Sequence, residues 1–124
     1  MKTGVFRNTM IRKYDDRPRV EKQSHGGDGT VMMTSILNGQ EELHGIGSFF
    51  SVITVPPGCS LGWHTHMGEC EAALVITGCG ECFDGDKTEA FTPGDVLLAP
   101  DKSGHAVRNT GTDPVELVVL VYYT

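Results

Sequence analysis

Short runs of β-branched and aromatic residues alternate with turn sequences along most of the chain. Such runs predict strands, and they cover residues 31–37, 48–55, 71–77, 81–84, 88–91, 96–99, 106–109 and 115–123. Turns rich in glycine, proline and aspartate separate the runs at the short intervals typical of sandwiches and barrels. Helical periodicity is nearly absent, with one helical turn expected over residues 40–44. The pattern therefore predicts an all-β, antiparallel fold.

The length and composition of the chain fit a single domain. Its 124 residues, of which 39% are hydrophobic, are enough for one modest core. No internal repeat or linker divides the sequence. We expect a β-barrel domain over residues 31–124, preceded by an N-terminal arm or strand over residues 1–30. Basic residues in that arm alternate with acidic ones, which predicts a solvated segment.

Charge and hydropathy narrow the range of partners. The net charge of −6 would repel a phosphate backbone, and no basic run offsets it. No apolar run approaches the ~20 residues of a membrane-spanning helix. The first residues also lack the apolar segment of a signal peptide. We therefore expect a cytoplasmic protein that binds neither nucleic acid nor a membrane.

The chain has four cysteines, Cys59, Cys70, Cys79 and Cys82. Cys79 and Cys82 have the C-x-x-C spacing found in redox pairs and in half of a zinc site. Their flanks are β-like on both sides, and residues three apart on one strand face opposite sides of the sheet. We therefore expect four free thiols.

One group of residues has the composition of a transition-metal site. His64 and His66 stand two apart, so on a strand they face the same way with Cα atoms ~6.6 Å apart. A turn over residues 67–70 would return Glu71 beside them on the next strand. Two imidazoles and a carboxylate suit Mn, Fe, Ni, Zn or Cu. The alternative is that the two histidines are hydrogen-bonded core or surface residues.

The residues around this group resemble the two motifs of the cupin family. The first motif is matched in spacing by Gly58, His64, His66, Glu71 and Gly78. The second motif is matched downstream by Gly94, Pro100, His105 and Asn109. The family pattern has a glycine two residues after the proline, whereas this chain has Lys102 there and a glycine at Gly104. The turn before His105 therefore departs from the family pattern.

The resemblance implies a metal site and a fold. It implies an antiparallel double-stranded β-helix, or jelly-roll barrel, and it adds His105 as a fourth ligand to His64, His66 and Glu71. Four protein ligands on an octahedral ion would leave two adjacent positions for water, O₂ or a chelating substrate.

The resemblance also implies a class of function without choosing a reaction. Cupins include decarboxylases, dioxygenases, isomerases and lyases, so we expect a metal-dependent enzyme acting on a small polar organic acid or sugar acid. The alternative is a non-catalytic module that binds or senses a metal or a small metabolite. No general base beyond the ligands is identifiable, which disfavours complex acid–base chemistry.

Three further expectations concern the surface. His25 and His44 are expected to be surface residues without a role as ligands. Trp63 should face away from the metal and pack in an interface or against the N-terminal arm. We expect a homodimer, in which residues 31–37 could add to the sheet edge of a neighbour.

Overall fold

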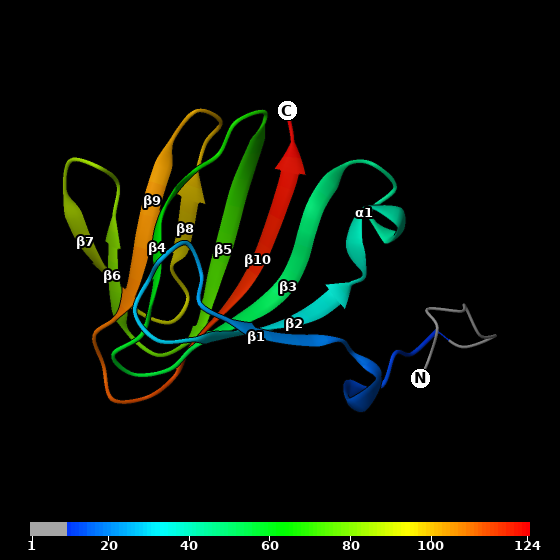
Figure 1. Ribbon diagram of the computed structural model, residues 1–124, viewed down its shortest axis with the longest axis horizontal. Helices are drawn as coiled ribbons and strands as arrows, with labels where there is room; N and C mark the ends of the chain where they lie inside the picture. The colour runs from blue at the N-terminus through cyan, green and yellow to red at the C-terminus, as the bar shows by residue number, and fades with distance from the viewer. Residues whose placement is uncertain (1–9) are drawn as a thin grey trace.

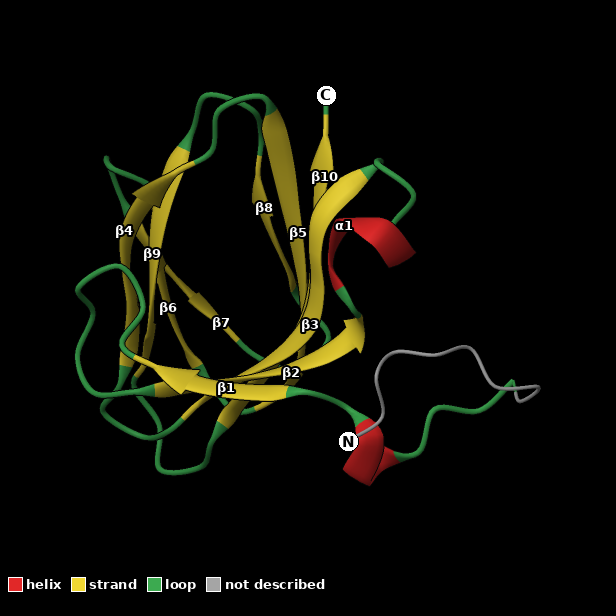
Figure 2. Cartoon of the chain, turned by 45° about the vertical axis from the view of Figure 1, so that its right-hand side comes forward, coloured by secondary structure: helices red, strands yellow, loops and turns green. Residues whose placement is uncertain are grey.

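Residues 10–124, which the computed structural model describes, form a barrel of two antiparallel sheets (Figure 1). The larger sheet has the strand order β1 (Arg19–Lys22), β2 (Val31–Leu37), β3 (Gly47–Val55), β10 (Val115–Tyr123), β5 (Glu69–Thr77), β8 (Val96–Ala99). The smaller sheet has the order β4 (Ser60–Thr65), β9 (Gly104–Asn109), β6 (Gly80–Phe83), β7 (Thr88–Phe91). Figure 2 shows the two sheets as facing walls of the barrel. The prediction of an all-β, antiparallel fold is confirmed.

The eight predicted strands are all present, each with bounds within two residues of those expected. The expected helical turn is α1 (Gly39–Glu42), and a 3₁₀ turn, η1, covers Tyr14–Asp16. The hydrophobic pattern did not indicate β1 or the start of β4. Three of the four residues of β1 are charged, and β4 contains Gly62 and a register shift between Leu61 and His64, so neither has regular alternation.

The segment before β2 is joined to the barrel. The guanidinium of Arg12 pairs with the carboxylate of Glu42, with nitrogen–oxygen distances of 3.0 and 2.5 Å. Arg17 donates from Nε to the carbonyl of Ser35 at 2.7 Å. Most residues between 10 and 30 are exposed, but Arg12 and Arg17 find acceptors on α1 and β2, so this part of the arm is attached to the barrel. Residues 1–9 of the predicted arm lie outside the described residues.

β1 covers the sheet edge at which the sequence predicts a neighbouring chain. It pairs with β2 along that edge, so the strand over residues 31–37 has a partner on each side. The homodimer itself stays a prediction.

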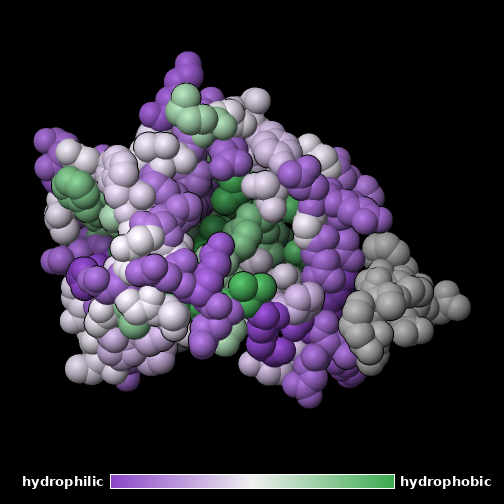
Figure 3. All heavy atoms as spheres, viewed as in Figure 1, coloured by the Kyte–Doolittle hydropathy of each residue, from purple (hydrophilic) through white to green (hydrophobic). Residues whose placement is uncertain are grey.

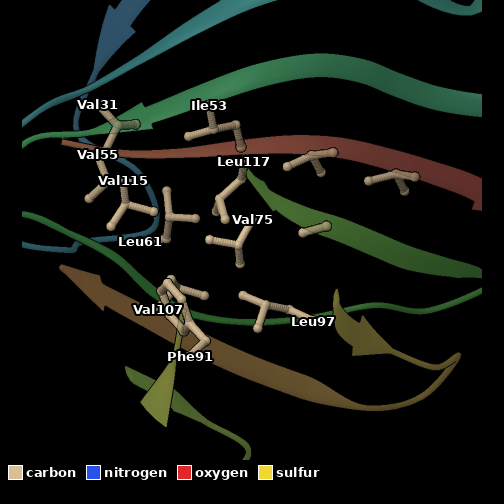
Figure 4. Packing of buried hydrophobic residues seen from close by; sticks show 13 residues of the cluster. Val31, Ile53, Val55, Leu61, Val75, Phe91, Leu97, Val107, Val115 and Leu117 are labelled. Carbon is tan, nitrogen blue, oxygen red and sulfur yellow. The ribbon is translucent and has the colours of Figure 1, made fainter. Parts of the chain in front are cut away.

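The core fills one end of the barrel. Inward-facing side chains from both sheets meet there, as expected for alternating strands (Figure 4). Val55, Val115 and Leu117 are at most 1% exposed. Further along β10, Val119 and Val121 belong to the same buried cluster and also line a cavity. The closed end supplies packing, and the other end leaves space for a site.

Two sequence predictions concern groups away from this cavity. All four cysteines are free; Cys79 is exposed, whereas Cys82 packs against the core. No helix within residues 10–124 is long and apolar enough to cross a membrane.

Candidate metal centre

A cavity of about 230 Å³ lies between the sheets at the open end of the barrel. Figure 3 shows the molecule hollowed there, with hydrophobic residues inside the hollow and hydrophilic residues around it. The apolar part of the lining includes Met33, Phe49, Ile53, Val119 and Val121. The polar part includes Lys22, Ser24, His25, Ser48, Thr65, Glu69 and three residues of the predicted metal site, His64, His66 and Glu71.

The barrel brings the four predicted ligands together from both sheets. In the smaller sheet, His64 of β4 pairs directly with His105 of β9. His66 follows the end of β4, where its backbone N–H donates to the carbonyl of Ser103 at 2.8 Å. Glu71 lies on β5 of the larger sheet and faces them. The ligand-type atoms of His64, His66, Glu71 and His105 lie within 4.8 Å of one another.

The spacing of these atoms suits one ion. The Nε2 atoms of His64 and His105 are 2.9 Å apart. The Glu71 carboxylate lies 3.3 Å from Nε2 of His66 and 3.2 Å from that of His105, while His64 Nε2 is 4.0 Å away. Ligands ~2.1 Å from an octahedral ion lie ~3.0 Å apart when adjacent and ~4.2 Å apart when opposite. The observed distances fall close to these two values.

The hydrogen bonds on the far side of two rings favour a proton on Nδ1, so that Nε2 of each ring faces the other ligands. His64 Nδ1 donates to the carbonyl of Gly62 at 2.8 Å, because a carbonyl oxygen can only accept. His66 Nδ1 lies 3.3 Å from the carboxylate of Glu69. In a neutral ring this places the lone pair on Nε2, and Nε2 of His66 is buried without a hydrogen-bond partner. A cation would satisfy that nitrogen.

The electrostatics keep a negative charge at the centre. Burial raises the pKa of Glu71, but the hydrogen bond from His105 and the nearby His64 ring outweigh burial and lower this pKa to about 2. Burial lowers the pKa of His64, whereas the carboxylate of Glu71 and the carbonyl of Gly62 raise it above the ordinary imidazole value overall. The centre is therefore built around an ionised carboxylate.

The structure adds two residues to the site that sequence reasoning missed. Glu69 contacts His66 in the cavity wall, so a carboxylate beyond the ligands is present after all. The sequence contains an indication of Glu69, because residues two apart on one strand face the same side and Glu69 stands two residues before Glu71. His25 is exposed as predicted, but its ring also stacks on His64 at 4.2 Å between centroids and an interplanar angle of 16°. His44 is exposed and does not line the cavity.

Trp63 does not line the cavity, as expected. Its ring lies 5.8 Å from that of Phe83, between centroids, and 46% of the residue is exposed, so packing in an interface stays a prediction. A Cβ atom on Gly104 would come within 2.5 Å of the Trp63 ring, so the shifted glycine makes room for the indole. Lys102 has a φ of 68°, a conformation that favours glycine, at the position where the family pattern has one.

Comparison with known proteins identifies the family. Residues 51–121 match the Cupin domain. The chain belongs to the cupin family. This cupin is 30% identical over 121 residues to the oxalate-binding protein of Thermotoga maritima, covering 98% of each chain.

Solved structures show the same fold. The structure is similar to that of a predicted oxalate decarboxylase from Thermotoga maritima, with a TM-score of 0.87, 28% identity, and 93% of this chain and 100% of that chain covered. A Klebsiella pneumoniae protein with a double-stranded β-helix domain, 21% identical, has a TM-score of 0.68 over 93% of this chain and 90% of its own. The double-stranded β-helix predicted from the motifs is therefore confirmed.

Proposed function

We propose that His64, His66, Glu71 and His105 bind one divalent transition ion, and that this centre binds a small dicarboxylate. Oxalate is the first ligand to test, because a relative that aligns along 98% of this chain is an oxalate-binding protein. The observation that carries the proposal is the buried, unpartnered Nε2 of His66, which faces the carboxylate of Glu71 at 3.3 Å. With its hydrogen on Nδ1, the His66 ring offers the lone pair of Nε2 to a cation shared with the Glu71 carboxylate.

The chemistry of the donor set limits the ion. Three imidazoles and one carboxylate suit Mn, Fe, Ni, Zn or Cu, and such an ion would supply a Lewis-acidic centre with room for further ligands. The protein's own part is to hold the four ligands from two sheets and to orient two imidazoles through Gly62 and Glu69.

The cavity suits a small acid. Its volume of about 230 Å³ lies below the range of ~300–1,000 Å³ typical of sites for larger organic ligands. Lys22 and His25 line its polar side, and the ammonium of Lys22 attracts a carboxylate. The apolar side, which includes Met33 and Phe49, lowers the local dielectric and strengthens that attraction.

Glu69 supports a second candidate, an enzyme that decarboxylates the bound acid. Cleavage of the carbon–carbon bond of oxalate releases CO₂, and the remaining carbon takes up one proton to give formate. The Glu69 carboxyl group lies in the cavity wall and hydrogen-bonds with His66, so it could carry that proton. If the protein only binds the acid, Glu69 orients His66 and the acid is not converted.

Metal analysis and calorimetry test the proposal together. Protein purified without added metal should contain about one transition ion per chain, and oxalate should bind to the metal-loaded form but not after chelator treatment. His105→Ala should lower both metal content and oxalate binding with the β-sheet circular dichroism unchanged. Oxalate binding by the metal-free protein would contradict the proposal. Release of formate from oxalate by the wild type, and loss of this release in Glu69→Gln, would identify the protein as a decarboxylase.

We also propose a cytoplasmic location, because four free thiols suit a reducing compartment.

A further inference from the structure

One of the four proposed ligands does not lie on a strand. His64, Glu71 and His105 belong to β4, β5 and β9, where strand pairing fixes their backbone. His66 lies in the turn between β4 and β5, in which Gly68 has a φ of 76°. Connecting segments are more mobile than the strands they join. The position of the His66 ring therefore depends on what holds this turn.

The loop between β8 and β9 lies against the turn and forms main-chain hydrogen bonds with it. The N–H of His66 donates to the carbonyl of Ser103 at 2.8 Å, and the N–H of Lys102 donates to the carbonyl of His66 at 2.8 Å. These two bonds extend the pairing of β4 with β9 beyond its last pair, Thr65 with Gly104. Figure 1 shows the turn and the loop at the same end of the barrel, where β10 also ends.

Asp101 adds a side-chain contact from the same loop. One oxygen of its carboxylate accepts from the N–H of Gly68 at 2.7 Å, and the other accepts from the hydroxyl of Thr124 at 3.1 Å. The N–H of Thr124 in turn donates to the carbonyl of Gly68 at 3.1 Å. Both main-chain polar groups of Gly68 are therefore bonded, two residues after His66. We call Gly68, Asp101 and Thr124 the rim contact.

The backbone of Lys102 shows that the loop is held in a specific conformation. Its φ of 68° lies in the left-handed region, which residues other than glycine seldom adopt. Such a conformation persists where the surrounding structure holds it. Here the bond from Lys102 to His66 and the bond from Gly68 to Asp101 both join the loop to the turn. The loop and the turn therefore hold one another.

We propose that Asp101 is a positioning residue of the metal centre, which acts through Gly68 to fix the turn that presents Nε2 of His66 to the ion. The inference rests on the proposed function, because it takes His66 as a ligand. Asp101 does not line the cavity, so it would touch neither the ion nor the acid.

The backbone is the better fixed part of His66. The contact of its Nδ1 with Glu69 measures 3.3 Å, longer than the ~3.0 Å of an ordinary hydrogen bond. The bonds that hold the turn to the loop measure 2.7 and 2.8 Å. A metal ligand has to be held within ~0.5 Å of its productive position. A turn released from Asp101 should therefore weaken the ion site even though all four ligands remain.

Competition between the protein and a chelator for Zn(II) tests the inference. Asp101→Ala removes both acceptor oxygens, and the Zn(II) dissociation constant should rise about tenfold, the lower end of the effect of outer partners of metal ligands. Asp101→Asn keeps an amide oxygen that can accept from Gly68, so it should restore most of the affinity. Both variants should keep the wild-type circular dichroism, because Asp101 lies between β8 and β9.

Asp84→Ala is the matched control. The carboxylate of Asp84 also accepts two main-chain hydrogen bonds, from Asp86 and Lys87 at 2.9 Å each, but in the turn between β6 and β7. The variant loses the same charge and the same kind of contact, and it should bind Zn(II) like the wild type. An equal loss of affinity in Asp84→Ala would overturn the inference, and so would an Asp101→Asn variant as weak as Asp101→Ala, since the loss would then follow charge.

Hydrogen exchange in the metal-free protein separates this inference from the proposed function. The amides of His66 and Lys102 should exchange severalfold faster in Asp101→Ala than in the wild type, with no ion involved. Unchanged exchange of both amides would overturn the inference, as would unchanged Zn(II) affinity in Asp101→Ala. A wild type that binds no Zn(II) but shows the faster exchange in Asp101→Ala would contradict the metal site and leave the rim contact as a support of the turn alone.

Discussion

The cavity receives its residues from two regions that reach it in different ways. The region from β4 to β9 brings His64, His66, Glu71 and His105 together through hairpins and direct strand pairing. The segment from β1 to residue 30 brings Lys22, Ser24 and His25, and it reaches β4 by tertiary contacts alone. The first region would hold the ion, whereas the second would form the wall that the acid meets.

The second region depends on close backbone contact. The amide N–H of Gly62 donates to the carbonyl of Ser24 at 3.0 Å, and that of Ser60 donates to the carbonyl of Asp28 at 3.0 Å. A Cβ atom on Gly62 would overlap the carbonyl oxygen of His25. The backbone of Ser60 and Gly62 in β4 therefore connects the ion-binding region to the wall.

The largest effect is expected from removing two ligands of the ion-binding region, which leaves the wall unchanged. Replacing both His64 and His66 by alanine should abolish tight metal binding, with a loss in affinity of at least ~100-fold. His44→Ala, which changes an exposed histidine away from the cavity, should retain the metal. Metal content after dialysis and competition with a chelator measure how tightly each variant binds the ion. One tightly bound equivalent in the double variant would place the site elsewhere.

A large effect is also expected from pH, and it concerns the ion-binding region alone. The imidazoles must lose their protons to bind an ion, and the pKa of His64 is raised, so metal affinity should begin to fall above the ordinary imidazole pKa as the pH is lowered. The pKa of Glu71 is lowered to about 2, so this carboxylate stays ionised throughout. Metal titrations between pH 8 and 5 measure the loss. Affinity unchanged down to pH 5 would exclude imidazole ligands.

Gly62→Ala should uncouple the wall from the ion-binding region. The added methyl group opposes the backbone of His25 and Gly27, so we expect a loss of about 1–3 kcal/mol in the free energy of unfolding. Urea denaturation measures the change. Gly111→Ala is the control, because its Cβ would make only ordinary contacts of 3.5 Å or more. Equal stability of the two variants would show that the close contact with residues 24–27 is unimportant.

His25→Ala should act on the acid rather than on the ion. The variant removes a ring that stacks on His64 and lines the cavity, so oxalate affinity should fall about tenfold while metal content stays at the wild-type level. Calorimetry with metal-loaded protein measures the affinity. A loss of metal equal to that of His105→Ala would instead make His25 part of the ion-binding region.

The smallest effect belongs to the outermost part of the N-terminal segment. Glu42→Gln removes the ion pair with Arg12, and we expect a loss of about 0.5–1 kcal/mol in stability. Hydrogen bonding to Arg12 lowers the pKa of Glu42, so this contribution is present above the ordinary carboxyl pKa and disappears as the pH falls below it. Denaturation at pH 7 and pH 3 should therefore separate wild type and variant only at pH 7. A difference that persists at pH 3 would contradict the ion-pair explanation.

The two regions also differ in how well the sequence predicts them. His64, His66 and Glu71 are close in sequence, so strand period and one turn were sufficient to group them. His105 required the motif resemblance, since its pairing with His64 spans 41 residues. No local pattern connects His25 to His64, because their stacking depends on where the segment after β1 meets β4. Apolar alternation likewise predicted the central strands, but not the charged β1, whose position depends on β2.

The position of Trp63 gives the protein an intrinsic optical probe. It is the chain's only tryptophan, it precedes His64, and its indole packs against Phe83 on the outer side of the same sheet. With one fluorophore, the emission spectrum comes from one known position. A paramagnetic ion such as Cu(II) or Mn(II) at the adjacent imidazole should quench this emission, whereas Zn(II) should shift it without quenching. Steady-state fluorescence can therefore follow loading of the centre in unlabelled protein.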